Sequence, residues 1–279
     1  MTETPSLLRN WYFCINAKGF DTFLPHIRAA VMSARANTTL APHCLYSGDE
    51  ARHRAILTRL GVTVIDHKPS LAAELRQGYG EHYDAFAGHW LRVDLPFIET
   101  SEEFVLYSDV DVMFLGHPTL PQMPRVLAAA PEYDRNSRRH FNSGVMVMNI
   151  PRLQDLYGPF CRAIRARLSG NFSYPPHDQE SYNRFFRASA LNRFRGRARS
   201  RLAPELNWKP YWGIAPNAKL VHFHGPKPPK VRVFQNGGGS PADKGLYDLW
   251  DSDRAAYDHY ATLWEGYEAA GRPLTAEPG

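Results

Sequence analysis

The sequence has few cysteines and no long apolar run. Three cysteines stand far apart among its 279 residues, at Cys14, Cys44 and Cys161, and no C-x-x-C pair occurs. This spacing excludes a disulfide scaffold and a cysteine-rich zinc site, and it suits a reducing compartment. No apolar stretch approaches the roughly 20 residues that cross a bilayer, and residues 1–5 lack the features of a secretory signal. We therefore expect a cytoplasmic protein that touches a membrane at most peripherally, at its inner face.

Acidic residues are scarce in one part of the chain. The whole sequence carries a formal charge of +5. Residues 1–150 hold 14 basic and 16 acidic side chains, residues 151–240 hold 16 and 4, and residues 241–279 hold 3 and 8. The basic character is thus local, and its position says more about binding partners than the total charge does. Contents of 43% hydrophobic and 13% aromatic residues exclude a disordered chain and a coiled coil.

Apolar segments alternate with amphipathic segments in the first half of the chain. We expect strands at 11–16, 39–46, 62–65 and 104–108, and helices at 20–36, 51–60 and 83–99. The second half predicts strands at 145–150 and 219–223, helices at 151–168, 178–186 and 242–270, and a loop at 236–240. This alternation predicts an α/β fold with a mostly parallel sheet covered on both faces. We expect one domain over residues 1–240 and a helical extension, 241–279, packed on it.

Two aspartates follow the strongly apolar strand at 104–108. A single valine separates Asp109 from Asp111, and more apolar residues come after them. Carboxylates are costly to hold at the end of a buried strand unless something compensates them. A divalent cation does so, because Mg²⁺ and Mn²⁺ take oxygen ligands and bridge to phosphates. Open α/β sheets also bind ligands beyond the carboxyl ends of their strands. We interpret the pair as a metal site, and the alternative is two solvated turn residues.

Two further segments bring polar residues to the ends of expected elements. Asn142, Ser143 and Gly144 stand at the entry of a buried strand, where the alternative is an ordinary turn. Asp178 and Gln179 follow two prolines and open an expected helix. Asp178 either caps that helix or faces a polar ligand together with Gln179.

The last expected strand ends in a segment with two histidines, a glycine and a lysine. It contains His222 and His224, followed by Gly225 and Lys227. Imidazole is a common ligand of transition metals. A glycine lets backbone N–H groups approach an anion, and a lysine supplies a point charge for phosphate. A single histidine is more often structural, and we interpret His224 as structural or as a group that orients a ligand.

In chain order these segments resemble the motifs of a known family. It is the retaining glycosyltransferase family 8, which has the GT-A fold and includes glycogenin and bacterial lipopolysaccharide α-galactosyltransferases and α-glucosyltransferases. The matching segments are 88–96 with Arg92, 108–111, 141–144, 178–179 and 222–225. A further segment, 204–208, is similar to a stretch that the family has near the acceptor. The resemblance covers most of residues 11–228.

The resemblance implies a role for each matched residue. The implied ligands of Mn²⁺ or Mg²⁺ are Asp109, Asp111 and His222. The residues implied at the donor nucleotide and its phosphates are Asn16, Lys18, Arg92, Asp109, Gly225 and Lys227. Those implied at the donor sugar are Asn142, Ser143, Asp178 and Gln179, of which Asp178 and Gln179 lie beside the reacting carbon.

The sequence departs from the family pattern at two places. Only Pro226 separates Gly225 from Lys227, where the family usually has two residues, so Lys227 reaches the diphosphate differently or Lys230 takes its place. The first strand ends in Asn16-Ala-Lys18 instead of a loop with acidic residues for the base.

Seven arginines and no acid occupy residues 184–201. The alternate spacing from 193 to 201 suits one face of a strand. The alternatives for this run, Arg184–Arg201, are a solvated face, an anionic acceptor site and a peripheral contact with an anionic membrane. We expect no nucleic acid, because few aromatic residues interleave with the arginines. Near the C-terminus, Trp250, Tyr257 and Trp264 recur every seven residues, which indicates packing or a protein contact.

We therefore predict an enzyme that transfers a hexose from a nucleotide sugar, UDP-galactose or UDP-glucose, with Mn²⁺ or Mg²⁺. The acceptor is a glycan, a lipid-linked sugar or a protein, and the anomeric configuration is retained. One alternative is a sugar-phosphate nucleotidyltransferase. Such enzymes resemble each other in a glycine-rich loop after the first strand, and the single Gly19 at that place argues against this alternative. A second alternative is a non-catalytic protein that binds sugar nucleotides or polyanions. The intact set of implied metal ligands, Asp109, Asp111 and His222, argues against it.

Overall fold

The chain, described here as a computed structural model, forms two units between which it passes several times. The structure describes residues 8–170 and 177–276, so residues 1–5 and the two prolines 175 and 176 lie outside it. Unit 1 comprises Met1–Thr22, Ala41–Asp109 and Thr119–Leu202, and unit 2 comprises Phe23–Leu40, Val110–Pro118 and Ala203–Gly279. Residues 241–279 belong to the same unit as residues 203–240, so the boundary between the units does not fall at residue 240.

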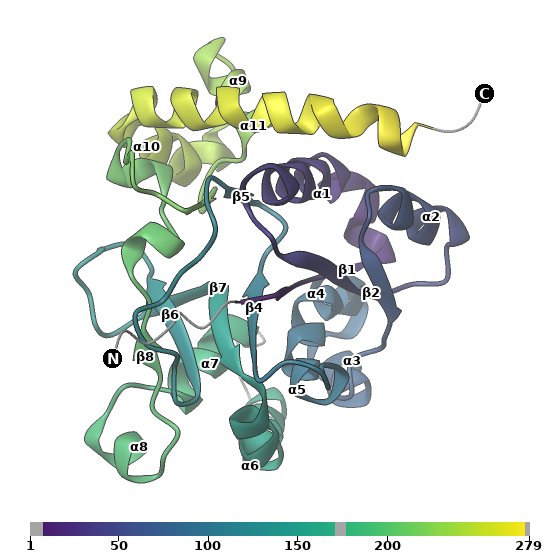
Figure 1. The fold of residues 1–279 in the computed structure, drawn as a ribbon, viewed down its shortest axis with the longest axis vertical. Helices are drawn as coiled ribbons and strands as arrows, with labels where there is room; N and C mark the ends of the chain where they lie inside the picture. Colours follow the sequence, from purple (N-terminus) through teal and green to yellow (C-terminus); the bar gives the residue numbers. More distant parts are fainter. Residues whose placement is uncertain (1–7, 171–176, 277–279) are drawn as a thin grey trace. The chain divides into compact units, whose positions relative to one another are not determined.

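Unit 1 contains a mostly parallel sheet, as the sequence predicts. Within the described residues this sheet has seven strands in the order β3-β2-β1-β4-β7-β6-β8 (Figure 1). They are β1 (Asn10–Asn16), β2 (Ala41–Ser47), β3 (Thr63–Asp66), β4 (Phe104–Ser108), β6 (Leu127–Pro131), β7 (Phe141–Asn149) and β8 (Ser200–Arg201). The strands from β3 to β4 are parallel, whereas β7 is antiparallel to β4 and to β6. The start of β7 therefore lies at the same edge as the ends of β1 and β4.

Helices cover both faces of this sheet. The helices that lie wholly in unit 1 are α2 (Ala51–Arg59), α3 (Ala72–Tyr79), α4 (Tyr83–Trp90), α5 (Leu95–Ile98), α6 (Ile150–Leu168), α7 (Asp178–Phe185) and α8 (Ala190–Phe194), and α1 (Ala17–Asn37) begins in unit 1 and continues into unit 2. In α6, Leu153, Phe160 and Ile164 recur at helical spacing and are buried in the core of unit 1. The side chain of Asn149 caps this helix by accepting from Arg152 N at 3.0 Å.

Unit 2 contains a small antiparallel sheet and a set of C-terminal helices. The elements are β5 (Val112–Phe114), β9 (Leu220–His222), α9 (Pro228–Gln235), α10 (Lys244–Ser252) and α11 (Arg254–Thr275). Single 3₁₀ turns occur at Gly80–His82, Leu91–Val93, Pro204–Leu206, Pro210–Trp212 and Pro241–Asp243. Trp250, Tyr257 and Trp264 are buried in the core of this unit, which confirms the packing role predicted for them.

The structure corrects several boundaries predicted from the sequence. The single helix predicted at 83–99 is broken into α4, a 3₁₀ turn and α5, because Pro96 lacks an N–H and is tolerated only in the first turn of a new helix. The strand predicted at 145–150 starts earlier, at Phe141, so Asn142 and Ser143 lie inside β7 instead of in a turn. The arginine run is not one strand face, since it folds into α8 and connecting segments, and only Ser200–Arg201 pair as strand.

The sequence analysis also missed α3, β5, β6, α8 and α9. The weakest signal is that of β6, Leu-Ala-Ala-Ala-Pro, because alanine has little preference for strands. Among the described residues, no helix combines the length and the apolarity that crossing a membrane requires.

Candidate active site

The polar residues predicted in unit 1 gather at one edge of its sheet. Asn16 ends β1, Asp109 follows β4, and Asn142 and Ser143 lie at the start of β7. The backbone N–H of Asp109 donates to the carbonyl of Gly144 at 2.8 Å, which ties the turn after β4 to the start of β7. Parallel and antiparallel strands thus deliver these side chains to the same edge, as the rule for open α/β sheets predicts.

Arg92 lies at this edge, and its positive charge is paired with carboxylates of the protein. The side chain is only 3% exposed. Nη1 lies 3.3 Å from Oδ1 of Asp109 and donates to the carbonyl of Ser143 at 2.9 Å, while Nη2 is paired with Asp178. The guanidinium also lies over the ring of Tyr107, 4.9 Å from its centroid. Burial lowers the pKa of Arg92, but Tyr107 and Asp109 outweigh burial and hold that pKa above its ordinary value.

Asp178 and Gln179 are the first residues of α7, and both turn toward β7 and Arg92. The residue at the N-cap is His177, so Asp178 does not cap the helix and its buried carboxylate pairs with Arg92 instead. Oε1 of Gln179 accepts from the backbone N–H of Ser143 at 2.9 Å. Nε2 of Gln179 donates to Glu132 at 2.6 Å. This amide therefore ties the start of β7 to the residue that follows β6.

Asn16 is held by hydrogen bonds within unit 1, whereas the side chain of Lys18 is exposed. Oδ1 of Asn16 accepts from Gly19 N at 3.0 Å, and its Nδ2 donates to the carbonyl of Asp84 at 2.6 Å. Asn16 thereby caps α1 and ties it to α4. Lys18 is exposed in the first turn of α1. The predicted contacts of both residues with the donor stay predictions.

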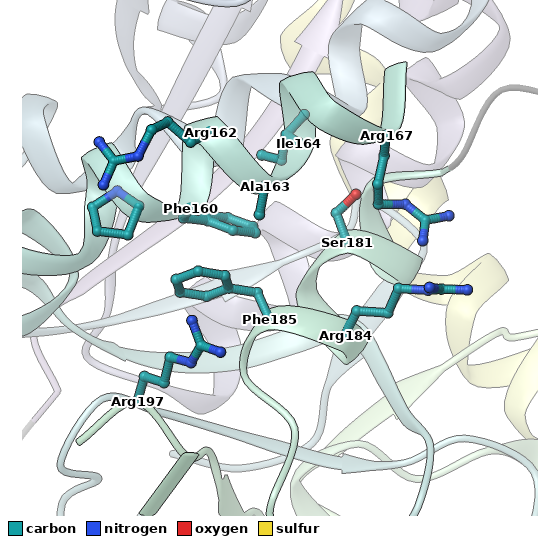
Figure 2. Close-up of a pocket in the computed structure, with 10 residues that line it drawn as sticks. Phe160, Arg162, Ala163, Ile164, Arg167, Ser181, Arg184, Phe185 and Arg197 are labelled. Carbon is teal, nitrogen blue, oxygen red and sulfur yellow. The ribbon is translucent and has the colours of Figure 1, made fainter. Parts of the chain in front are cut away.

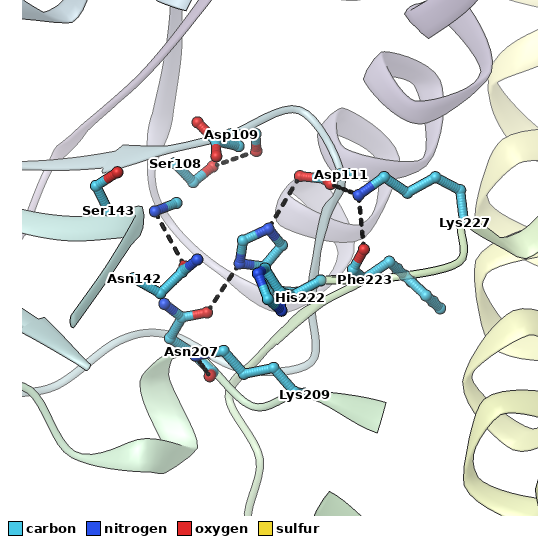
Figure 3. A network of polar contacts seen from close by, with 12 residues as sticks. Ser108, Asp109, Asp111, Asn142, Ser143, Asn207, Lys209, His222, Phe223 and Lys227 are labelled. Carbon is cyan, nitrogen blue, oxygen red and sulfur yellow. Dashed lines mark hydrogen bonds and ion pairs between the residues drawn. The ribbon is translucent and has the colours of Figure 1, made fainter. Parts of the chain in front are cut away.

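In unit 2, Asp111 and His222 are brought together by the small antiparallel sheet. Val112 of β5 pairs with His222 of β9, and Phe223 N donates to the carbonyl of Asp111 at 3.1 Å. As a result, Nε2 of His222 lies 3.3 Å from Oδ1 of Asp111, and both side chains are buried (Figure 3). This carboxylate oxygen is buried without a hydrogen bond from any described residue.

The protonation of His222 decides what this contact means. Nδ1 of His222 faces Oδ1 of Asn207 at 3.1 Å, and an amide oxygen can only accept, so Nδ1 carries the ring proton (Figure 3). In the neutral ring Nε2 then presents a lone pair toward the lone pairs of Asp111. Two acceptors that face each other in a buried site fit a cation between them.

Lys227 supplies the positive charge closest to Asp111. Its Nζ pairs with Oδ2 of Asp111 and donates to the carbonyl of Phe223 at 2.7 Å (Figure 3). Burial raises the pKa of Asp111, but that pKa lies well below its usual value, and the charge of Lys227 is the largest cause of the lowering. Lys230, considered above as a substitute, is instead paired with Asp243 at 2.8 Å.

Gly225 and His224 shape the segment around these groups. Gly225 has a φ of +114°, in the region that favours glycine, and a Cβ there would lie 3.0 Å from Leu249 and 3.1 Å from the hydroxyl of Tyr257. His224 contacts the hydroxyl of Tyr211 through Nδ1 at 3.1 Å. Burial is the largest cause that lowers the pKa of His224, to about 3, and the charges of Lys209 and Lys227 lower it further, so this ring stays neutral.

The sequence analysis did not identify the contacts that two residues make in this site. Glu132, which binds Gln179, lies in a loop for which no motif was recognised. Asn207 belongs to the segment predicted to lie near the acceptor, but its side chain contacts His222. A histidine that binds a metal commonly has such an outer partner, yet nothing in the sequence indicates which residue, 15 positions away, it would be.

No protein-family model matches the sequence, and no curated protein does, but solved structures match it well. A structure of galactosyltransferase LgtC in complex with donor and acceptor sugar analogues matches with a TM-score of 0.61. That match covers 96% of this chain and 97% of LgtC at 17% identity. The chain has the GT-A fold. This confirms the fold class that the sequence predicts.

Two further glycosyltransferase structures share this fold. Glycosyltransferase GlyE of Streptococcus pneumoniae TIGR4 matches with a TM-score of 0.54 and 16% identity over 94% of this chain, which spans 64% of the length of GlyE. Mouse xyloside xylosyltransferase 1 matches with a TM-score of 0.51 and 15% identity over 78% of this chain and 98% of its own. At such identities the likeness concerns the fold, and the chemistry has to be argued from the side chains.

Proposed function

We propose that this GT-A chain is a metal-dependent glycosyltransferase. It transfers a hexose from a nucleotide sugar, UDP-galactose or UDP-glucose, to a glycan, a lipid-linked sugar or a protein. The observation that carries the proposal is the buried contact in unit 2 between Asp111 and Nε2 of His222, whose Nδ1 is tied to Asn207. A cytoplasmic location stays a prediction.

The residues present fit a divalent cation. Asp109, Asp111 and His222 each offer one ligand atom. Asp109 is two residues from Asp111, so the covalent chain alone keeps their Cα atoms within about 7 Å of each other. Carboxylate oxygens suit both Mg²⁺ and Mn²⁺, but an imidazole nitrogen is a poorer ligand for Mg²⁺. We therefore expect Mn²⁺ to be preferred.

Each residue of the set has its own task in this proposal. A bound divalent cation would neutralise the charge that develops on the departing nucleoside diphosphate. Lys227 pairs with Asp111 and would turn to a donor phosphate when Asp111 holds a cation. Gly225 would let the backbone approach the same phosphates. The contact of Arg92 with the donor stays a prediction, and its contacts hold Asp109 and Asp178 in place.

The sugar-binding set belongs to unit 1. Asn142, Asp178 and Gln179 would bind sugar hydroxyls, and Ser143 would line the same edge. Asp178 is already paired with Arg92 and is thus poorly placed to act as a nucleophile. We propose retention by attack from the face of the departing phosphate. A β-linked product from an α-linked donor, detected by NMR of the anomeric proton, would contradict this part of the proposal.

The first experiment is a screen of nucleotide sugars for metal-dependent hydrolysis and transfer. Asp111→Asn should lower kcat/KM with Mn²⁺ by roughly a hundredfold or more, because the amide has lost the negative charge that holds the cation. The matched control is Asp248→Asn, which changes an exposed aspartate of unit 2 that pairs only with Lys244 among the described residues. Its activity should equal that of the wild type.

Three results would overturn the proposal. They are full activity of Asp111→Asn, turnover that persists in excess chelator, and no turnover of any nucleotide sugar. Release of pyrophosphate from a nucleoside triphosphate and a sugar phosphate would instead identify a nucleotidyltransferase. Binding of UDP-sugars without turnover would identify a non-catalytic binding protein.

A further inference from the structure

The short helix α8 of unit 1 presents large apolar side chains to solvent. Phe194 is 91% exposed and Leu191 is 55% exposed. The two residues are three apart, so they lie on the same side of this single helical turn. Figure 1 shows α8 on the loop that leaves α7 and leads to β8. Apolar groups of this size are seldom left in water without a use.

Hydrogen bonds inside the loop fix the orientation in which α8 exposes Phe194 and Leu191. Asn192 is 4% exposed, and its Nδ2 donates to the carbonyls of Phe185 and Arg187 at 3.0 and 2.8 Å. Its Oδ1 accepts from Nε of Arg197 at 2.7 Å. The guanidinium of Arg152 on α6 donates to the carbonyl of Gly196 at 3.0 Å. A five-residue helix is not stable by itself, so these bonds fix the direction in which Phe194 points.

The five arginines between residues 187 and 199 fall into two groups. Arg187, Arg193 and Arg195 are exposed. Arg197 lies over the ring of Phe185 and Arg199 over the ring of Phe141, so these two stabilise the loop from inside. No acid occurs between residues 184 and 201. The segment that carries Leu191 and Phe194 is therefore positively charged.

A basic cavity adjoins this loop in the same unit. Its volume is about 410 Å³, and Phe160 and Phe185 form part of its wall (Figure 2). Its charged lining residues, among those described, are Arg162, Arg167, Arg184 and Arg197. Glu180 pairs with Arg167 and Arg184, so Arg162 and Arg197 are the lining arginines for which no ion pair to a described residue is found.

We propose that α8 docks on an anionic lipid bilayer. Phe194 and Leu191 enter the interface between headgroups and acyl chains, and Arg187, Arg193 and Arg195 pair with headgroup phosphates. An aromatic ring flanked by arginines suits this interface, where one part of the surface is apolar and the other is charged. The contact is peripheral, and it goes beyond the proposed transfer reaction because it requires neither the metal nor the donor.

Two other partners fit the tip less well. Single-stranded nucleic acid uses aromatic rings for stacking, and an exposed leucine adds nothing to stacking. A protein partner needs a complementary interface of about 1,000 Å² or more, whereas this tip is one convex turn of helix. A fluid bilayer adapts to such a tip.

The test is flotation of the full chain with phosphatidylcholine vesicles, with or without about 30% phosphatidylglycerol. Phe194→Ser should lower the partition coefficient on anionic vesicles about tenfold. The double variant Arg193→Gln and Arg195→Gln should lower it about 25-fold, because each charge contributes about fivefold, and added salt should do the same. Phe194→Trp should keep the binding, since tryptophan favours this interface.

The matched control is Phe97→Ser, which removes a phenylalanine of α5 in the same unit that is 58% exposed. Its partition coefficient should equal that of the wild type. Equal binding of wild type and Phe194→Ser, or equal binding to vesicles with and without phosphatidylglycerol, would overturn the proposal. Binding to RNA or heparin but to neither kind of vesicle would also overturn it and would assign the arginines to a soluble polyanion.

Discussion

The two units differ in how they compensate buried charged side chains. In unit 1, Arg92 pairs with Asp109 and Asp178, and every polar group of Gln179 has a protein partner. In unit 2, Oδ1 of Asp111 lies 3.3 Å from Nε2 of His222, and Lys227 compensates the other oxygen of Asp111. In the first arrangement protein carboxylates pair with the charge of Arg92, although its Nε donates to no described residue. The second brings together a carboxylate and an imidazole, which are groups that suit a cation.

This difference separates charged groups that stabilise the folded protein from charged groups that bind a ligand. A charge that is fully paired inside the protein contributes to stability, and its loss exposes the cost of burying its partner. A charge aimed at a missing ligand contributes to binding, and its loss leaves the metal-free protein nearly as stable as before. Substitutions of similar size in the two units should therefore change different measured quantities.

The largest effect on stability is expected at Arg92. Arg92→Met keeps much of the side-chain volume but leaves the carboxylate of Asp178 buried without its partner. The free energy of unfolding should fall by about 3–5 kcal/mol, as for other broken buried ion pairs. Denaturant titration in metal-free buffer measures this change.

The control for this prediction removes the orphaned charge. Adding Asp178→Asn to Arg92→Met should recover part of the lost stability, because the amide is less costly to bury than the carboxylate. A loss below about 1 kcal/mol in Arg92→Met would show that the pair does not hold unit 1 together.

Acid should weaken the two units in different pH ranges. In unit 2, burial lowers the pKa of His26 from 6.5 to about 4. The folded protein thus binds this proton less readily than the unfolded chain, so stability present above pH 6.5 is lost as the pH falls toward 4, by up to about 3 kcal/mol. In unit 1, burial raises the pKa of Glu99, but hydrogen bonds from Asn10, Ser101 and Tyr12 lower it to about 2. Its contribution persists above pH 4.5 and is lost only below that pH.

The variant His26→Phe separates these two ranges. His26 packs against Phe23 and Trp264, so a phenylalanine retains the aromatic contacts. Unfolding by denaturant at pH 7.5, 5.5 and 4.5 should show that the wild type loses more stability on acidification than the variant. Equal losses in both proteins would mean that His26 does not titrate as its burial indicates.

Much of the fold was predictable because its signals are local. The strand at Phe104–Ser108 is a continuous apolar run, and α6 shows a clear amphipathic period, so both were located within two residues. The strand β6 was missed because its alanines have little preference for strands. The break after Trp90 was missed although Pro96 is a local sign of it. The alternating arginines suggested a strand, but Asn192 and Arg152 fold that segment into α8 through contacts that no local pattern shows.

The candidate site was predictable in its residue types and less so in its partners. Asp109, Asp111 and His222 came from motifs whose chemistry can be read from the residues. The pairing of Arg92 with Asp178 joins residues 86 positions apart, and the contact of Asn207 with His222 joins residues 15 apart. Such contacts depend on strand order and helix placement, and a single sequence does not specify them.

The smallest of these effects is expected at Asn207, and it tests the unit 2 side of the comparison most directly. Asn207→Ala removes the acceptor of the Nδ1 proton of His222 but leaves every proposed metal ligand in place. The affinity for Mn²⁺ should fall about 10- to 100-fold, because the ring loses its orientation and some basicity. Asn207→Asp should restore the affinity, since a carboxylate accepts the same proton more strongly. Asn217→Ala, at an exposed amide of the same unit, should bind Mn²⁺ like the wild type. If calorimetric titration shows unchanged Mn²⁺ affinity in Asn207→Ala, His222 is not held by this contact, and the opposed lone pairs no longer indicate a cation.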